Sequence, residues 1–182
     1  VLVYNNTLLT EAHQMGPASN VHFRNNLILG QGSWPEVFSV ETFTPYSSSD
    51  YNGFSAATSG ASLFAWAAPA GKADYGARGE RPLQSFPTLA AYSGRTGQDT
   101  HSRMVDWSIF RQARAPAQGD PTRLYRPEDF DFTLTPGAAA IDGGMVLPGI
   151  TDGFTGNAPD LGALEFGAAP PAYGPRPIAA QP

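Results

Sequence analysis

Apolar and polar residues alternate with a period of two in two N-terminal segments that resemble each other. The segments read VLVYNNTLLT over residues 1–10 and VHFRNNLILG over residues 21–30. Such alternation predicts half-buried β-strands. A repeat of twenty residues is too short for a pair of helices and suits a solenoid of stacked strands, with an ordinary sheet of hairpins and Asn turns as the alternative.

An Asn-Asn pair lies in each repeat at the point where the strand has to bend. Asn tolerates the left-handed backbone conformation that such bends require. Stacked repeats would place Asn5 over Asn25 in a buried ladder, and Asn52 of a weaker third copy, SSSDYNGF, would extend it. Between the second and third copies, the segment WPEVFSVETF predicts a further strand.

The remainder of the chain divides by composition. We expect strand repeats over 1–54, a long Ala-, Gly- and Ser-rich insertion or loop over 55–84, a helix, final coil and cap of the same domain over 85–166, and a flexible Pro/Ala-rich tail over 167–182. In the third segment, Ser85 is expected to cap a helix through 88–92 that ends at Gly94 or Gly97. Strands are expected over 101–110 and 161–166.

The order of several motifs resembles a known family. After VYNNT, FRNNLILG and DYNGF come FPTLAAYSGRTGQDTHS, DWSIF, DFTLTPGAAAIDGG and GNAPDLGALEF. Over about residues 1–166 the chain resembles the C-terminal part of secreted bacterial right-handed parallel β-helix proteins, the pectate lyase-like or polysaccharide lyase-like superfamily. It departs from their pattern at Trp107 where proline is usual, at Ala138-Ala139 for Ser-Pro, and at Leu164 for Tyr.

This resemblance implies a fold class and a location. The expected fold is all-β, a right-handed parallel β-helix represented by its C-terminal coils with a short helix and a turn-rich cap. The expected location is secreted, periplasmic or at the bacterial cell surface. The activity stays open, because the same scaffold carries lyases, hydrolases, epimerases and adhesins.

Composition narrows the classes of partner and chemistry. Gly 20 and Pro 17 argue against a bundle of long helices, and the absence of cysteine excludes disulfides and thiolate catalysis. The formal net charge of −5 and the lack of a basic cluster argue against nucleic acid, and no apolar run is long enough for a membrane helix. The chain starts inside an apolar alternation at Val1, so upstream coils of the same parent chain are the expected neighbours of the first strand.

The outward positions of the repeat strands form the main candidate site. Tyr4, His22 and Arg24 should lie side by side there, and Trp66 is a further candidate for contact with substrate. Arginine binds a sugar carboxylate bidentately, an aromatic ring stacks on apolar sugar surface, and His22 could act as a base. The alternative is that these are solvated side chains without a ligand.

Two polar clusters further along the chain have competing explanations. Asp99 and His101 in GQDTHS are either a catalytic dyad or residues that satisfy turn amides. Asp152, Asn157 and Asp160 offer oxygens for a calcium ion, but Asp and Asn beside Gly commonly stabilise turns. We therefore expect no cofactor, with calcium as the alternative.

The leading functional hypothesis is a polysaccharide-degrading enzyme, lyase-like and specific for acidic polysaccharide. Its main catalytic residues would lie upstream, with His22 and Arg24 as the candidates within this chain. The alternative is a non-catalytic carbohydrate-binding or adhesin-type surface scaffold. Under both hypotheses the partner is a polysaccharide or oligosaccharide.

Overall fold

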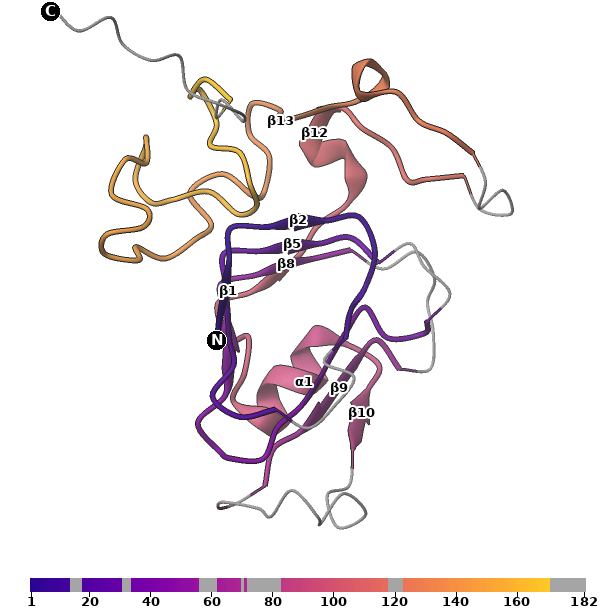
Figure 1. The fold of residues 1–182 in the computed structure, drawn as a ribbon, viewed down its shortest axis with the longest axis vertical. Helices are drawn as coiled ribbons and strands as arrows, with labels where there is room; N and C mark the ends of the chain where they lie inside the picture. The colour runs from indigo at the N-terminus through magenta and orange to yellow at the C-terminus, as the bar shows by residue number, and fades with distance from the viewer. Residues whose placement is uncertain are drawn as a thin grey trace, which may run out of the picture.

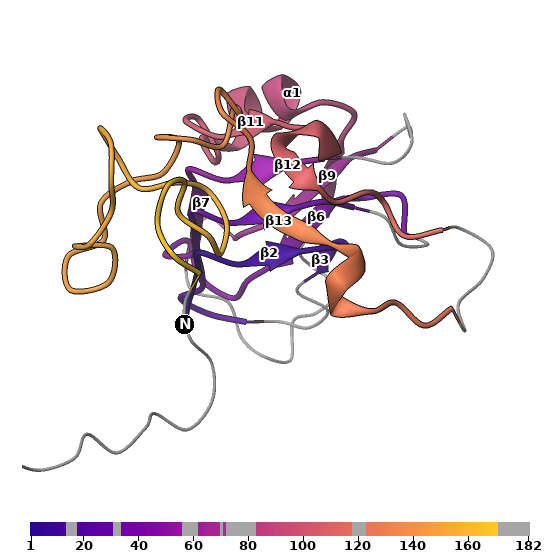
Figure 2. The same cartoon turned by 90° about the horizontal axis from the view of Figure 1, so that it is seen from above.

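The computed structural model describes residues 1–13, 18–30, 34–55, 62–69, 71, 83–117 and 123–170. The strands of these residues form four sheets, and one α-helix, α1 (Leu89–Thr96), lies beside them (Figures 1 and 2). Two short 3₁₀ helices, η2 (Trp107–Ile109) and η3 (Pro127–Asp129), complete the regular elements of the described residues.

Two of the sheets are built only from parallel strands. The first contains β1 (Leu2–Tyr4), β4 (His22–Arg24) and β7 (Ser48–Asp50). The second contains β2 (Thr7–Leu8), β5 (Leu27–Ile28), β8 (Gly53–Phe54) and β11 (Arg103–Met104), and β2, β5 and β8 lie one below the other in Figure 1. Leu2 pairs with His22, so the twenty-residue repeat of the sequence is also the offset between paired strands.

The other two sheets contain antiparallel pairs. β3 (Ala12–His13), β6 (Phe38–Glu41) and β9 (Phe64–Ala67) are parallel, but β10 (Gln84–Phe86) joins β9 antiparallel. β12 (Phe110–Gln112) pairs antiparallel with β13 (Asp131–Leu134). β6 confirms the strand expected in WPEVFSVETF, whereas β9 lies in the segment expected to be a loop.

The expected fold class, an all-β right-handed parallel β-helix, is wrong. The described strands are two to four residues long and belong to four separate sheets, two of them with antiparallel pairs, together with a helix of eight residues. No closed β-helix is detected in this part of the chain. The difference arises at β10 and β13, which pair antiparallel with β9 and β12, whereas stacked coils of a parallel β-helix pair only in parallel.

A column of aromatic rings forms the main core. Phe23, Phe38, Phe54, Phe64 and Tyr92 follow one another with ring centroids 5.1–5.4 Å apart. Four of these five rings are fully buried, and Phe23 retains 7% exposure. Offset and edge-to-face aromatic contacts add stability beyond the burial of area, so this column joins the parallel strands to α1.

A second apolar cluster covers the opposite face of the β2–β5–β8–β11 sheet. Leu27 and Leu29 point into it and meet Ile109, Leu134 and Leu161, all at most 5% exposed. Ile28, between the two leucines, points into the aromatic core instead. Because successive residues of a strand face opposite sides, this sheet is buried on both faces, and the C-terminal segment is held against it.

The boundaries of several expected elements differ in the structure. Thr88, and not Ser85, caps α1 through its side chain, and Gly97 ends the helix at a φ of 70°. Ser85 lies in β10. Residues 161–166 are mostly bends and irregular backbone where a last strand was expected. Residues 56–61, 70, 72–82 and 171–182, which include most of the expected tail, lie outside the described residues.

Candidate functional site

A ladder of asparagine side chains fixes the strand ends that carry the candidate site. The Oδ1 atom of Asn26 accepts hydrogen bonds from the backbone N and the Nδ2 of Asn6, at 3.1 and 2.9 Å. Asn52 repeats the same two bonds toward Asn26, at 3.0 and 2.9 Å, and its own Nδ2 donates to Asp99 at 3.0 Å. Asn26, Asn52 and Asp99 are at most 1% exposed, so the ladder is a buried polar network.

The ladder corrects the predicted alignment of Asn52. Asn25 Nδ2 donates to Asn5 Oδ1 at 3.4 Å, so these two residues are stacked as expected, with φ values of 56° and 48°. Asn52, however, continues the neighbouring column of Asn6 and Asn26. In the column of Asn5 and Asn25 the third residue is Tyr51, whose backbone is also left-handed, with a φ of 56°.

The exposed face of β1, β4 and β7 carries a row of chemically different side chains. Tyr4 is in register with Arg24, and Arg24 is in register with Asp50. Neighbouring strands are about 4.8 Å apart, so the row crosses the sheet in a short distance. Tyr4 is 38% exposed, and the side chains between these positions, such as Phe23, point into the core. We call this row, together with Tyr51 and His101, the polar face.

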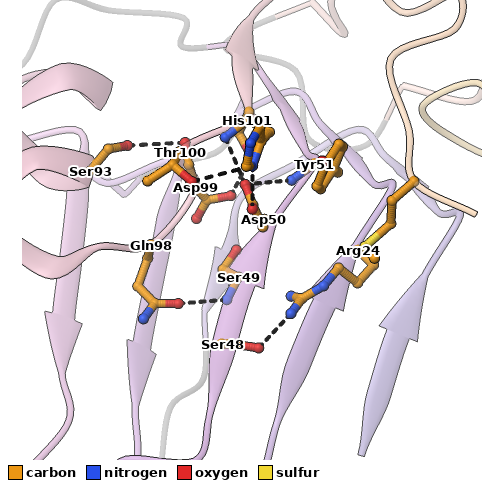
Figure 3. Close-up of polar contacts among 12 residues, drawn as sticks. Arg24, Ser48, Ser49, Asp50, Tyr51, Ser93, Gln98, Asp99, Thr100 and His101 are labelled. Carbon is orange, nitrogen blue, oxygen red and sulfur yellow. Dashed lines mark hydrogen bonds and ion pairs between the residues drawn. The ribbon is translucent and has the colours of Figure 1, made fainter.

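Arg24 is held in place by its own strand and the next one. Its Nη1 donates to the carbonyl of Phe23 at 2.7 Å, and its Nη2 donates to Ser48 Oγ at 2.6 Å (Figure 3). A guanidinium group has five N–H donors, so these two bonds orient the group and leave donors for a ligand.

Asp50 joins the sheet to the loop before β11. Its Oδ1 accepts hydrogen bonds from the backbone N of Tyr51 and of His101, and its Oδ2 lies 2.8 Å from Nδ1 of His101 (Figure 3). The Tyr51 ring stacks on the imidazole, with centroids 4.7 Å apart and an angle of 12° between the planes. The His101 side chain is 59% exposed, so a carboxylate and an aromatic ring fix an imidazole that faces solvent.

The other predicted histidine, His22, has a different environment. Its Nδ1 lies 2.9 Å from Ser48 Oγ, and its Nε2 lies 2.8 Å from Asn20 Oδ1. Partial burial, and then the charge of Arg24, lower the pKa of His22 below its usual value. Both ring nitrogens already have partners, so His22 is less suited than His101 to accept a proton from a ligand.

Asp99 has a structural environment and does not form a dyad with His101. It is 1% exposed and accepts hydrogen bonds from Asn52 and from Ser102 Oγ, at 3.0 and 2.6 Å. Burial raises the pKa of Asp99, and the bonds from Ser102 and Asn52 partly oppose that rise. The carboxylate that pairs with His101 is Asp50.

Trp66 does not lie on the polar face. It is in β9, is 6% exposed, and its ring is 6.2 Å from that of Tyr92 in the aromatic core. A residue in this position stabilises the core, so Trp66 is not available for the substrate contact expected of it.

The residues predicted to bind calcium are used in turns. Asp152 accepts from the backbone N of Gly149, Asn157 donates to Asp142, and Asp160 accepts from the backbone N of Asp142 and of Phe166. Within the described residues, no group of three or more His, Asp or Glu side chains could hold a metal ion.

The sequence placed Asp50 and Tyr51 in no candidate site, and it suggested Asp99, not Asp50, as the partner of His101. Asp50 was not placed in the row, although aligning DYN with YNN and RNN sets it beside Tyr4 and Arg24. His101 follows Asp50 by 51 residues, and no shared motif links the two. Their pairing depends on the folded path of the chain.

Comparisons of the chain with protein-family models, with curated proteins and with solved structures find no match. The resemblance to pectate lyase-like proteins therefore stays a prediction. No helix among the described residues has the length and apolar character needed to span a bilayer.

Proposed function

We propose that this chain is part of a carbohydrate-active protein that works outside the cytoplasm, secreted, periplasmic or at the cell surface. In this proposal the polar face binds an acidic oligosaccharide. The main support for this proposal is the register of Tyr4, Arg24 and Asp50 on adjacent strands. It places an aromatic ring, a guanidinium and a carboxylate side by side on the exposed face of one sheet.

The chemistry of the row fits such a ligand. Arg24 is oriented by Phe23 and Ser48, and its remaining N–H groups suit the two oxygens of a uronate carboxylate. The exposed ring of Tyr4 offers a flat surface for the apolar face of a sugar. His101 and Tyr51 extend the same surface beyond Asp50 and add a hydrogen-bonding imidazole edge.

Catalysis is the second candidate function, and the Asp50–His101 pair favours it. A carboxylate that accepts a hydrogen bond from Nδ1 leaves the lone pair of Nε2 free to accept a proton. In a lyase reaction the imidazole would take the proton beside a sugar carboxylate. The electron pair would then form a C=C bond as the glycosidic C–O bond breaks toward the leaving oxygen.

The test of the binding proposal is calorimetric titration of the chain with acidic and neutral oligosaccharides. We expect oligogalacturonate to bind and Arg24→Ala to weaken that binding about tenfold or more, because a hydrogen bond between charged groups is lost. Arg111→Ala is the matched control, since Arg111 is exposed on β12, away from the polar face. No binding of any acidic oligosaccharide, or an equal loss in both variants, would overturn the proposal.

The two candidate functions differ in their response to changes at His101. If the face is catalytic, wild-type protein will release unsaturated product from the polymer and His101→Ala will abolish the release. If the face only binds, no product forms with either protein, and Arg24→Ala still weakens binding.

A further inference from the structure

A cleft of about 330 Å³ lies next to the polar face. Tyr4 and Asn5 form one side of it, at the corner between β1 and β2. Ile150, Phe154 and Leu164 of the C-terminal segment, which lies beside that corner in Figures 1 and 2, form the other side. The volume is at the small end of the range of ligand sites, enough for part of a sugar residue and its substituent.

The lining of the cleft is mixed, with apolar side chains on its C-terminal side and one charged residue that is already hydrogen-bonded. Ile150 is 43% exposed and Phe154 and Leu164 are half-buried. Glu165 is the charged residue of the lining, and its two carboxylate oxygens accept hydrogen bonds from the backbone N of Thr155 and of Asp160. A sugar carboxylate would therefore gain nothing in the cleft, whereas a methyl group would be removed from water.

Tyr4 belongs both to the polar face and to the cleft. A chain of sugar residues bound along Tyr4 and Arg24 therefore leads directly to this opening. A methyl ester of the sugar carboxylate could supply a methyl group to the cleft, but it would remove the charge that Arg24 binds. An acetyl ester on a hydroxyl leaves the carboxylate free and supplies the methyl.

We propose that the cleft binds an O-acetyl group of an acidic oligosaccharide held on the polar face. This inference rests on the proposed function and makes its substrate class more specific. It assigns the cleft a role in selecting acetylated polymer, through contact of the acetyl methyl with Ile150, Phe154 and Leu164.

The experiment compares O-acetylated oligogalacturonate with the same oligomer after alkaline removal of the acetyl groups. Wild-type protein is expected to bind the acetylated form about fourfold more tightly, the value of burying one methyl group. Ile150→Ser and Leu164→Ser should each remove this preference, with thermal melting as the check on folding. Val146→Ser is the control, because Val146 is 47% exposed and does not line the cleft.

The outcomes separate this inference from the proposed function. Equal binding of both forms by wild-type protein, or a preference that survives in Ile150→Ser and Leu164→Ser, overturns the role of the cleft and leaves the polar face standing. Failure to bind either form overturns the proposed function and the inference with it. A preference lost in both variants and kept in Val146→Ser supports the inference.

Discussion

The stacked parallel strands and the C-terminal turns, residues 137–166, use the same side-chain chemistry in different ways. In the strands, Asn26 and Asn52 are buried, and each bonds to the equivalent residue of the preceding strand. In the turns, Asp142 accepts hydrogen bonds from the backbone N of Asn157 and of Ala158 and stays partly exposed. In the strand region the amide side chains bond to one another from strand to strand, whereas in the turn region the carboxylates of Asp142 and Asp160 bond to backbone N–H groups of neighbouring turns.

This difference shows why equivalent substitutions should have unequal effects. A buried amide that loses its partner bears the whole desolvation cost, while an exposed one is satisfied by water. The strand region also positions Tyr4, Arg24 and Asp50, so its network determines the geometry of the polar face.

The largest expected effect comes from breaking the ladder. Asn52→Leu leaves the backbone N and the Nδ2 of Asn26 without their acceptor, and it should lower the free energy of unfolding by about 2–6 kcal/mol. Asn157→Leu removes one exposed bond to Asp142 and should change that free energy by about 0.5 kcal/mol or less. Urea unfolding measures both variants, and similar losses would contradict the contrast between the regions.

A smaller effect on stability is expected when a carboxylate is replaced by the amide of the same shape, because the amide keeps most of the hydrogen bonds. The effect of such a substitution should depend on pH. Burial raises the pKa of Asp99, so the stability it contributes is full below the ordinary carboxyl pKa of about 3.9 and is lost as pH rises through its folded pKa. Asp99→Asn should therefore become more stable relative to wild type as pH rises toward 7.

Asp142 is the opposite case in the turn region. The backbone N–H groups of Ala158 and Asn157 lower the pKa of Asp142, so its stability is present above about pH 3.9 and is lost as pH falls. Asp142→Asn should be less stable than wild type near pH 7, and this difference in the free energy of unfolding should shrink as the pH falls. Urea unfolding between about pH 3 and 7 compares the two variants, and slopes of the same sign would refute the assignment.

The smallest expected effects come from two glycines and have opposite signs. Gly94 is exposed in α1 with open space around an added Cβ, so Gly94→Ala should stabilise the chain by about 0.4–1 kcal/mol. Gly156 has a φ of 91°, and an added Cβ would clash with Asp142 Oδ1, so Gly156→Ala should destabilise the chain. Melting temperatures measure both, and stabilisation by Gly156→Ala would show that this turn is not constrained.

The repeat in the sequence predicted what depends on local pattern. It gave the parallel pairing of β1 with β4 and β2 with β5, and the left-handed Asn5 and Asn25, because period-two alternation and bend residues are visible in a short window. The predicted fold class was wrong because β10, β12 and α1 lie in segments that contain no copy of the repeat.

The site depends on contacts that no short window contains. Tyr4, His22 and Arg24 could be placed together from the repeat, whereas the pairing of Asp50 with His101 spans 51 residues. Trp66 was misplaced because an aromatic residue in an Ala-rich segment gives no sign of whether it is buried, and the aromatic core decides this.

The most direct test of the polar face is an NMR titration of the ¹⁵N-labelled chain with oligogalacturonate. If the polar face binds the ligand, the backbone amides of Tyr4, Arg24 and His101 will show saturable shifts, while those of Gln112 and Thr133 in the β12–β13 sheet stay in place. The absence of saturable shifts, or shifts centred on β12 and β13, would contradict the claim that this face binds the ligand.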